Sequence, residues 1–287
     1  MKRILSINLF LMFFSLNAFC QKTFIPDDDF EQALINLGYD DVLDDSVYTS
    51  SIDTIESFGL YSNNSLVGIE DFSSLKYLYT APVDSINLTH NHNLIDLEIH
   101  FLHQNIINYF NVDGCHNLQN VQFDLYYYGS SPFGPSLTLD FTNNVNLERL
   151  HINNDFSGSY NSHIDIIVPD DNIISYLFFR NFAFNNDFFQ LLDSLTHLTL
   201  YHCDYTIPHL NLSNAQNLQC LLIDDFVSNV NNLKSLDLTN GVFQNLQSAD
   251  NEFESDISLM LVECIALDNP NGINDYNEFY YPTTSIY

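Results

Sequence analysis

INLTHNHNLIDLEI (residues 86–99) carries apolar residues at Ile86, Leu88, Leu94, Leu97 and Ile99. This spacing fits neither one face of an α-helix nor a simply alternating β-strand. It fits a frame of the form φ-x-φ, a polar turn, and then L-x-x-L-x-φ, where φ is an apolar residue. A stretch of this kind is one unit of an array if the same frame recurs along the chain.

The frame recurs in full four more times, in residues 110–123, 139–152, 166–179 and 210–223. Three partial copies are Leu75-Leu78-Thr80, Leu195-Leu198-Leu200 and Leu233-Leu236-Leu238. The first position of the L-x-x-L part falls at residues 75, 94, 118, 147, 174, 195, 218 and 233, and it is Leu in every unit except Ile174. The chain therefore contains an array of about eight degenerate units.

One such unit cannot bury its apolar ridge alone. The L-x-L triplet is a short strand that points alternate side chains inward, and stacking successive units joins the strands into a parallel sheet with a continuous core. The φ-x-φ segment returns on the far side, and turns rich in Asn, Asp, Ser and Thr form the corners. The long loop at residues 126–136 (YYYGSSPFGPS) is an insertion marked by Pro and Gly.

These units resemble the leucine-rich-repeat family, and most of all the secreted repeat proteins of Bacteroidetes-type bacteria, over roughly residues 23–270. The resemblance implies an α/β solenoid: a leucine-rich-repeat stack with a parallel β-sheet and an N-terminal cap. The Asn position of that family, three residues after the last strand apolar residue, is not Asn here but Leu102, Tyr126, Asp155, Phe182, Cys203, Phe226 or Gly241. We therefore expect an irregular convex side.

The entry segment TFIPDDDFEQALINLGYDD (23–41) also resembles the N-terminal cap of that family. Asp28 followed by Glu31 three residues later predicts a helix start, and Phe30, Ala33, Leu34 and Leu37 form one apolar face before Gly38. We expect a capping helix at about residues 28–37 within a cap spanning 21–60. The repeat solenoid follows over 61–270, and a C-terminal tail over 271–287.

Residues 1–20 have the pattern of a secretory signal peptide. Lys2 and Arg3 form the positive start, residues 4–14 the apolar middle, and Ala18-Phe19-Cys20 the cleavage site. Lipoprotein processing at Cys20 is the alternative, and the bulky Phe19 disfavours it. We expect export, to the periplasm, the cell surface or the medium, without a membrane span.

Removing residues 1–20 takes away two of the 7 basic residues and none of the 37 acidic ones, so the net charge becomes 5 − 37 = −32. A charge of this size works against binding to nucleic acid or an anionic membrane. Cys115, Cys203, Cys220 and Cys264 show no paired spacing and are expected to be buried free thiols.

The sequence contains none of the motifs of strong catalytic specificity, such as GxSxG, HExxH or a phosphate-binding Gly-rich loop. The His116/Cys115 and His202/Cys203 neighbours would point to opposite sides of a strand, so no metal site is predicted. No cofactor is expected either. The acidic loops at 27–29, 39–45 and 268–278 lack the ligand order of a calcium loop, although calcium at one of them stays an open alternative.

The residues between the inward-pointing ones line an exposed, sheet-forming face. Only two Arg remain after residue 20, and both fall on this face in adjacent units, among aromatic residues. Aromatic residues and Arg are the types that anchor interfaces. The candidate binding residues are Arg149, His151, Tyr176, Phe178, Arg180, His197 and Tyr201.

These features predict an exported, non-catalytic recognition or adhesion module that binds a protein or carbohydrate ligand on its exposed sheet face. One alternative is a hydrolase of exported polymers, for which Asp96, Glu98 and Asp124 are the nearest acidic candidates. Another is a structural remnant of a longer surface protein.

Overall fold

The computed structural model of the chain describes residues 21–61, 65–81, 83–101, 107–125, 137–154, 163–180, 182–184, 188–201, 203–205, 209–224, 235–239, 264–266 and 285–286. The predicted signal peptide and most of the predicted C-terminal tail lie outside these residues.

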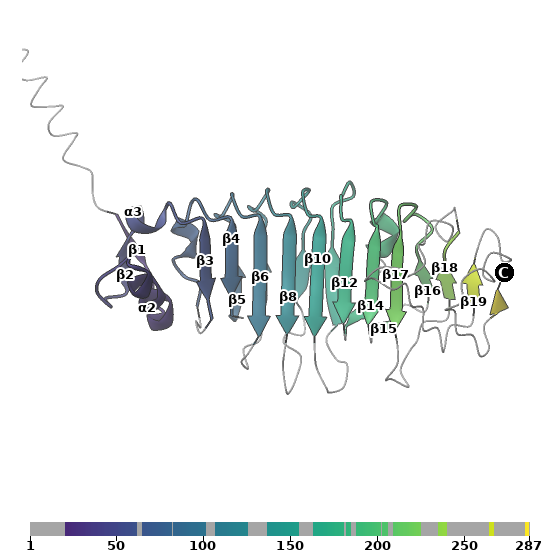
Figure 1. Ribbon diagram of the computed structural model, residues 1–287, viewed down its shortest axis with the longest axis horizontal. Coiled ribbons are helices and arrows are strands. Elements are labelled where there is room, and N and C mark those ends of the chain that lie inside the picture. Colours follow the sequence, from purple (N-terminus) through teal and green to yellow (C-terminus); the bar gives the residue numbers. More distant parts are fainter. Residues whose placement is uncertain are drawn as a thin grey trace, which may run out of the picture.

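The main feature is an eight-stranded parallel sheet whose strands follow one another in chain order, side by side along the long axis of the molecule (Figure 1). Its strands are β3 (Ser57–Leu60), β4 (Tyr77–Thr80), β6 (Asp96–Phe101), β8 (Asn120–Leu125), β10 (Arg149–Asn154), β12 (Tyr176–Arg180), β14 (His197–Tyr201) and β17 (Cys220–Asp224). Seven of them are the predicted L-x-φ segments. The first, β3, precedes residue 61, so the sheet starts earlier than the predicted solenoid.

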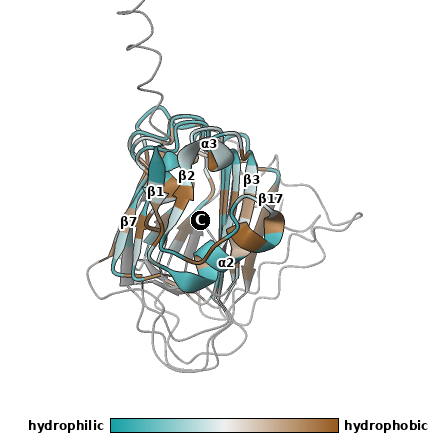
Figure 2. Ribbon diagram, turned by 90° about the vertical axis from the view of Figure 1, so that its left-hand side faces the viewer, coloured by the Kyte–Doolittle hydropathy of each residue, from teal (hydrophilic) through white to brown (hydrophobic). Residues whose placement is uncertain are grey.

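Shorter parallel strands form a second wall opposite the main sheet, as the end-on view shows (Figure 2). They are β5 (Ser85–Asn87) with β7 (Tyr109–Asn111), then β9 (Thr138–Asp140), β11 (His163–Ile167), β13 (Ala183–Phe184) and β15 (Asp204–Tyr205), and finally β16 (His209–Asn211), β18 (Ser235–Asp237), β19 (Cys264–Ala266) and β20 (Ser285–Ile286). The predicted φ-x-φ return is therefore present. The expectation of an irregular convex side is wrong for these residues, because their strands pair in register.

The core lies between the two walls. The predicted first ridge is buried in seven units, where each side chain is at most 1% exposed: Leu75, Leu94, Leu118, Leu147, Ile174, Leu195 and Leu218. The second ridge runs across the main sheet in register, for example from Leu97 to Val121 and from Leu150 to Leu177. Burial of these aligned side chains holds the stack together.

The corners between the walls carry asparagines before the first ridge residue, rather than three residues after the strand as in the leucine-rich-repeat family. Each of four units has an exposed Asn just before its first ridge residue, whose Nδ2 donates to a backbone carbonyl of the preceding unit. The bonds run from Asn93 to Ser73, Asn117 to His92, Asn146 to His116 and Asn217 to Asp193, at 2.8–3.0 Å.

Two further corner asparagines are fully buried. Asn144 donates to the carbonyls of Val112 and Cys115 at 3.0 and 2.9 Å, and Asn91 donates to that of Ile69 at 2.8 Å. Each of these three carbonyls also accepts a backbone amide of its own turn, so the asparagines add side-chain hydrogen bonds that join one unit to the next.

One repeat is placed differently from the prediction. The repeat frame predicts Leu233-Leu236-Leu238 in the main sheet, but β18 pairs with β16 in the second wall, with Leu236 opposite Leu210. The Asp237 side chain accepts a hydrogen bond from the Thr239 amide at 3.0 Å. In β16 the Asn211 side chain accepts one from the Ser213 amide at 2.9 Å, so the two segments end in the same kind of turn. The segment is therefore a φ-x-φ return.

The N-terminal segment lies at one end of the stack (Figure 1). It contains β1 (Lys22–Phe24) paired antiparallel with β2 (Ser46–Tyr48), and the helices α2 (Asp28–Leu37) and α3 (Thr49–Ile52). Two 3₁₀ turns, η1 (Ile69–Asp71) between β3 and β4 and η2 (Phe188–Leu191) between β13 and β14, lie in the stack. The side chain that caps α2 is Asp27 rather than the predicted Asp28. Leu37, predicted to lie on the apolar face of the helix, is 60% exposed.

The helix is joined to the first repeat through aromatic rings. Phe30 packs against Phe58 and Phe72 at centroid separations of 5.5 and 5.8 Å, and all three side chains are buried. Gly38 ends the helix with a φ of +83°, a left-handed conformation that favours glycine.

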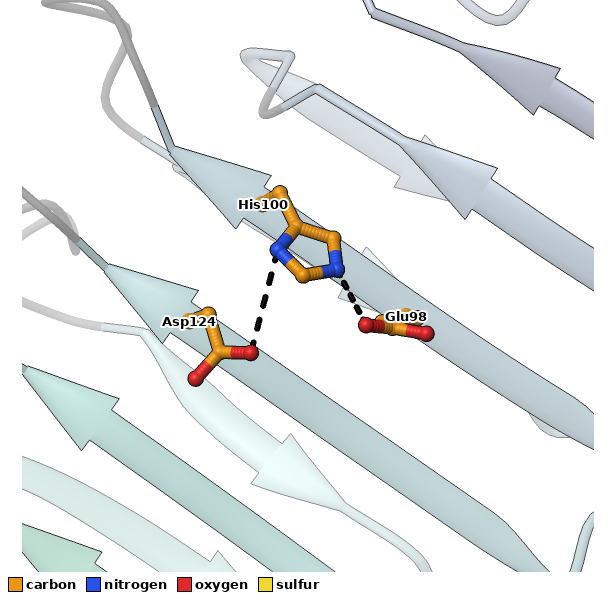
Figure 3. Close-up of side chains that lie close together, drawn as sticks. All are labelled: Glu98, His100 and Asp124. Atoms are coloured by element: carbon orange, nitrogen blue, oxygen red, sulfur yellow. Dashed lines mark hydrogen bonds and ion pairs between the residues drawn. The ribbon is translucent and has the colours of Figure 1, made fainter.

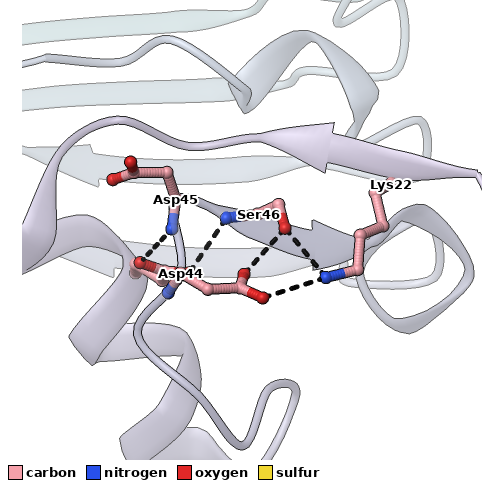
Figure 4. Close-up of polar contacts among 5 residues, drawn as sticks. Lys22, Asp44, Asp45 and Ser46 are labelled. Carbon is pink, nitrogen blue, oxygen red and sulfur yellow. Dashed lines mark hydrogen bonds and ion pairs between the residues drawn. The ribbon is translucent and has the colours of Figure 1, made fainter.

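A fully buried carboxylate fixes the loop after the helix. Glu31 accepts hydrogen bonds from the backbone amides of Asp44, Asp45 and Ser46, each at 3.0 Å. On the solvent side, Lys22 contacts Asp44 and Ser46 at 3.2 and 2.9 Å (Figure 4). The predicted role of Glu31 as partner of a helix cap is replaced by this loop contact.

Candidate functional site

The seven predicted binding residues lie on three neighbouring strands of the main sheet, on the face that points away from the core. Strand register sets them in rows: Arg149, Tyr176 and His197 form one row, and His151 and Phe178 lie opposite each other in the next. Arg180 and Tyr201 form a third row. We call this set of seven residues the Arg–aromatic patch.

Side chains of the patch pair through their flat faces. The Arg149 guanidinium lies over the Tyr176 ring at 4.2 Å, and the Arg180 guanidinium lies over the Tyr201 ring at 5.1 Å. His151 and Phe178 stack at 4.2 Å with an angle of 4° between their planes. Cross-strand pairs of this kind stiffen a surface, because each side chain restricts its neighbour.

The patch is also partly shielded from water. Burial raises the pKa of the Tyr176 phenol, although Arg149 opposes this effect. Burial and then the charge of Arg149 lower the pKa of His197, whose ring lies 6.1 Å from that of Tyr176. The His197 imidazole therefore favours its neutral form beside the guanidinium.

An acidic group borders the patch on β6 and β8. Glu98 and His100 lie on β6, and Asp124 lies opposite His100 on β8. His100 Nε2 contacts the Glu98 carboxylate, and its Nδ1 is 3.7 Å from Asp124 (Figure 3). Asp96, the third acid considered for a hydrolase, accepts a hydrogen bond from Asn120 on the neighbouring strand.

Asp124 links this acidic group to the patch, since its Oδ1 lies 3.6 Å from His151 Nε2. Gln122 and Asn153 donate to the same carboxylate at 2.6 and 3.2 Å. The His151 contact is the largest cause that lowers the pKa of Asp124 to about 2, and it outweighs the opposing effect of burial. A carboxylate with this pKa stays ionised and does not suit the general-acid role of a hydrolase.

Sequence reasoning placed the seven patch residues on one face, and the strand register brings all seven together. It missed the convergence of His100 with Glu98 and Asp124. The available signal was that Glu98 and His100, two residues apart on one strand, point to the same side. The cysteines are as expected where the structure describes them: Cys115, Cys203 and Cys220 are buried thiols, and burial raises the pKa of Cys115 to about 12.

No family model matches the sequence, and a search of curated proteins finds no match. Two similar solved structures come from Listeria monocytogenes. The functional domain of InlJ, described as including a cysteine ladder, has a TM-score of 0.47 and 18% identity, over 86% of this chain and 52% of that one. An internalin (inlF) from strain 4b F2365 has a TM-score of 0.43 and 15% identity, over 86% of this chain and 83% of that one. The chain thus spans about half the length of the first.

The architecture is a parallel β-solenoid with leucine-rich ridges, as the resemblance to leucine-rich-repeat proteins implies. None of the helices among the described residues has the length and apolar character needed to cross a membrane.

Proposed function

We propose that the chain is an exported, non-catalytic recognition or adhesion module that binds a protein or carbohydrate ligand through the Arg–aromatic patch. It would act outside the cell or at its surface, in the manner of the secreted Bacteroidetes-type repeat proteins that its units resemble. The part of the predicted N-terminal cap (21–60) that precedes β3 would cover the open end of the stack.

The pairing of the flat side chains is the observation that carries this proposal. Stacking of Arg149 on Tyr176 and of His151 on Phe178 holds these groups in place before a ligand arrives. Preordered side chains lose little conformational entropy on binding, and aromatic and Arg side chains supply large contact areas and several hydrogen-bond donors. The rigid sheet beneath allows such a face to vary without disturbing the core.

The experiment begins with capture of ligands from the natural surroundings of the source organism by the chain from Gln21 onward. The dissociation constant of each purified ligand is then measured for the wild type, Arg149→Ala and Phe178→Ala. We expect each substitution to weaken binding about 30-fold, the equivalent of a 2 kcal/mol anchor residue.

Tyr77→Ala is the matched control. Tyr77 is an aromatic residue on the same face, 37% exposed, on β4 at the far side of the acidic group. The affinity of Tyr77→Ala for each ligand, and the melting temperatures of all variants, should stay near those of the wild type. Equal affinity of the wild type and both patch variants would refute the assignment of this site. Turnover of a captured polymer would instead favour the hydrolase alternative.

A further inference from the structure

We propose that Glu98, His100 and Asp124 bind a divalent transition-metal ion of the zinc class. The three side chains lie on the outer face of two adjacent strands (Figure 3). The second of these strands, β8, pairs with β10, which carries Arg149 and His151 of the Arg–aromatic patch. One ligand atom from each lies within 4.8 Å of the other two. This proposal does not depend on the identity of any ligand of the patch.

The backbone explains why these side chains meet. Glu98 and His100 are two residues apart on β6, so both point outward on the same side of the sheet. Asp124 on β8 is in register with His100, which places it in the same row on that side of the sheet. Three ligands on two hydrogen-bonded strands need no long loop to bring them together.

The ligand set selects the type of ion. One imidazole nitrogen and two carboxylates suit Zn²⁺, Co²⁺ or Ni²⁺, whereas Ca²⁺ and Mg²⁺ prefer oxygen ligands only. Metal–ligand bonds of about 2.0–2.2 Å in a tetrahedral site put the ligand atoms roughly 3.4 Å apart. Small side-chain rotations would therefore bring the three donors from their present separation onto one ion.

The surroundings of Asp124 are those of an oriented metal ligand. Gln122 and Asn153 donate to its two oxygens at 2.6 and 3.2 Å, so the carboxylate is fixed before an ion arrives. Its side chain is only 11% exposed, while those of Glu98 and His100 are 24% and 34% exposed. An ion would have its remaining positions open to water or to a group of a bound ligand.

A competing arrangement uses both nitrogens of His100 without an ion. In it, Nε2 contacts the Glu98 carboxylate and Nδ1 faces the Asp124 carboxylate at 3.7 Å. A metal would occupy one of these nitrogens and release the other. The two arrangements can be distinguished by experiment, because only the metal site takes up an ion from solution.

The test uses the chain from Gln21 onward after removal of metal with a chelator that is then dialysed away. Zn²⁺ binding is measured by calorimetry, and Co²⁺ by its visible absorption, which reports the geometry and ligand number. We expect one strong site per chain. His100→Ala and Asp124→Asn should weaken it at least about 100-fold, and Gln122→Ala about 10-fold, since it acts through Asp124.

His116→Ala is the control, because His116 is an exposed corner histidine whose ring stacks on that of His92 at 6.5 Å. It should bind Zn²⁺ like the wild type, and circular dichroism should show all variants folded. The proposal is overturned if the wild type takes up no Zn²⁺ or Co²⁺. It is equally overturned if His100→Ala and Asp124→Asn keep the affinity of the wild type, or if only His116→Ala loses it.

Discussion

Replacement of the buried corner asparagine Asn144 by alanine should destabilise the stack far more than the same change two residues later, at Asn146. Asn144 is fully buried and donates two hydrogen bonds, to the carbonyls of Val112 and Cys115. Both bonds join one unit to the unit before it. Asn146 is exposed and donates one bond, to the carbonyl of His116 at 2.8 Å.

The magnitude follows from these contacts. Two buried hydrogen bonds of about 0.5–1.5 kcal/mol each give a loss of about 1–3 kcal/mol for Asn144→Ala. The penalty is no larger because both acceptors keep a backbone donor: the Cys115 amide bonds to Val112 at 2.8 Å and the Leu118 amide to Cys115 at 3.1 Å. At Asn146 water replaces the lost donor, so we expect a change within about 0.5 kcal/mol.

The assay is denaturant unfolding of the wild type and the two variants, followed by circular dichroism. The free energies are compared only if the transitions share one slope, since a repeat stack can lose cooperativity. Hydrogen exchange at the Leu147 amide, which bonds to the Asn144 carbonyl at 3.0 Å, gives a local check. Equal destabilisation by the two substitutions would show that the buried corner bonds do not hold the units together.

Three further predictions concern the core, the loop after α2 and the charge of Asp124. Leu177→Ala, at a fully buried position of β12, should lower the free energy of unfolding by about 2–5 kcal/mol. Thr199→Ala, on the outer face of β14, should lower it by less than about 0.5 kcal/mol. Similar unfolding midpoints for the two variants would contradict the assigned faces. Glu31→Gln leaves one side-chain oxygen to accept from three backbone amides, so hydrogen exchange of the Asp45 amide should accelerate. Unchanged protection of that amide would count against this contact. The third prediction follows from the pKa of Asp124, which is lowered to about 2. The ionised carboxylate should add about 2 kcal/mol to the free energy of unfolding above pH 4, and this contribution should vanish as the pH falls to 2. The stability difference between the metal-free wild type and Asp124→Asn should shrink over that range, and a constant difference would be inconsistent with the lowered pKa.

The sequence predicts most of the fold because the repeat frame records which side chains point inward. Ridge residues such as Leu97 and Leu150 are recognisable from spacing alone, and the outward positions between them follow from strand geometry. The seven patch residues were predictable for the same reason. Their pairing was not, because it depends on which strands are neighbours and in which register.

The errors have equally local causes. The family resemblance predicts the corner asparagines after the strand, whereas they precede its first ridge residue. The sequence shows this as repeated Asn-Leu pairs, at residues 93–94, 117–118, 146–147 and 217–218. Residues 236–238 (LDL) fit two parts of the frame. The Thr239 that follows them matches Thr142 after the 139–141 segment, and this match identifies the φ-x-φ return.

The stacking of units along one sheet is tested most directly by a distance between outward positions that are far apart in sequence. Tyr77 on β4 and His197 on β14 lie in the same row, five strand spacings apart. At about 4.8 Å per strand their Cα atoms should be roughly 24 Å apart. Spin labels on Tyr77→Cys/His197→Cys, measured by electron–electron double resonance with the wild type as background, should give one narrow peak near that distance. A broad distribution, or a peak well beyond about 35 Å, would contradict the continuous parallel stack on which the patch and the metal site depend.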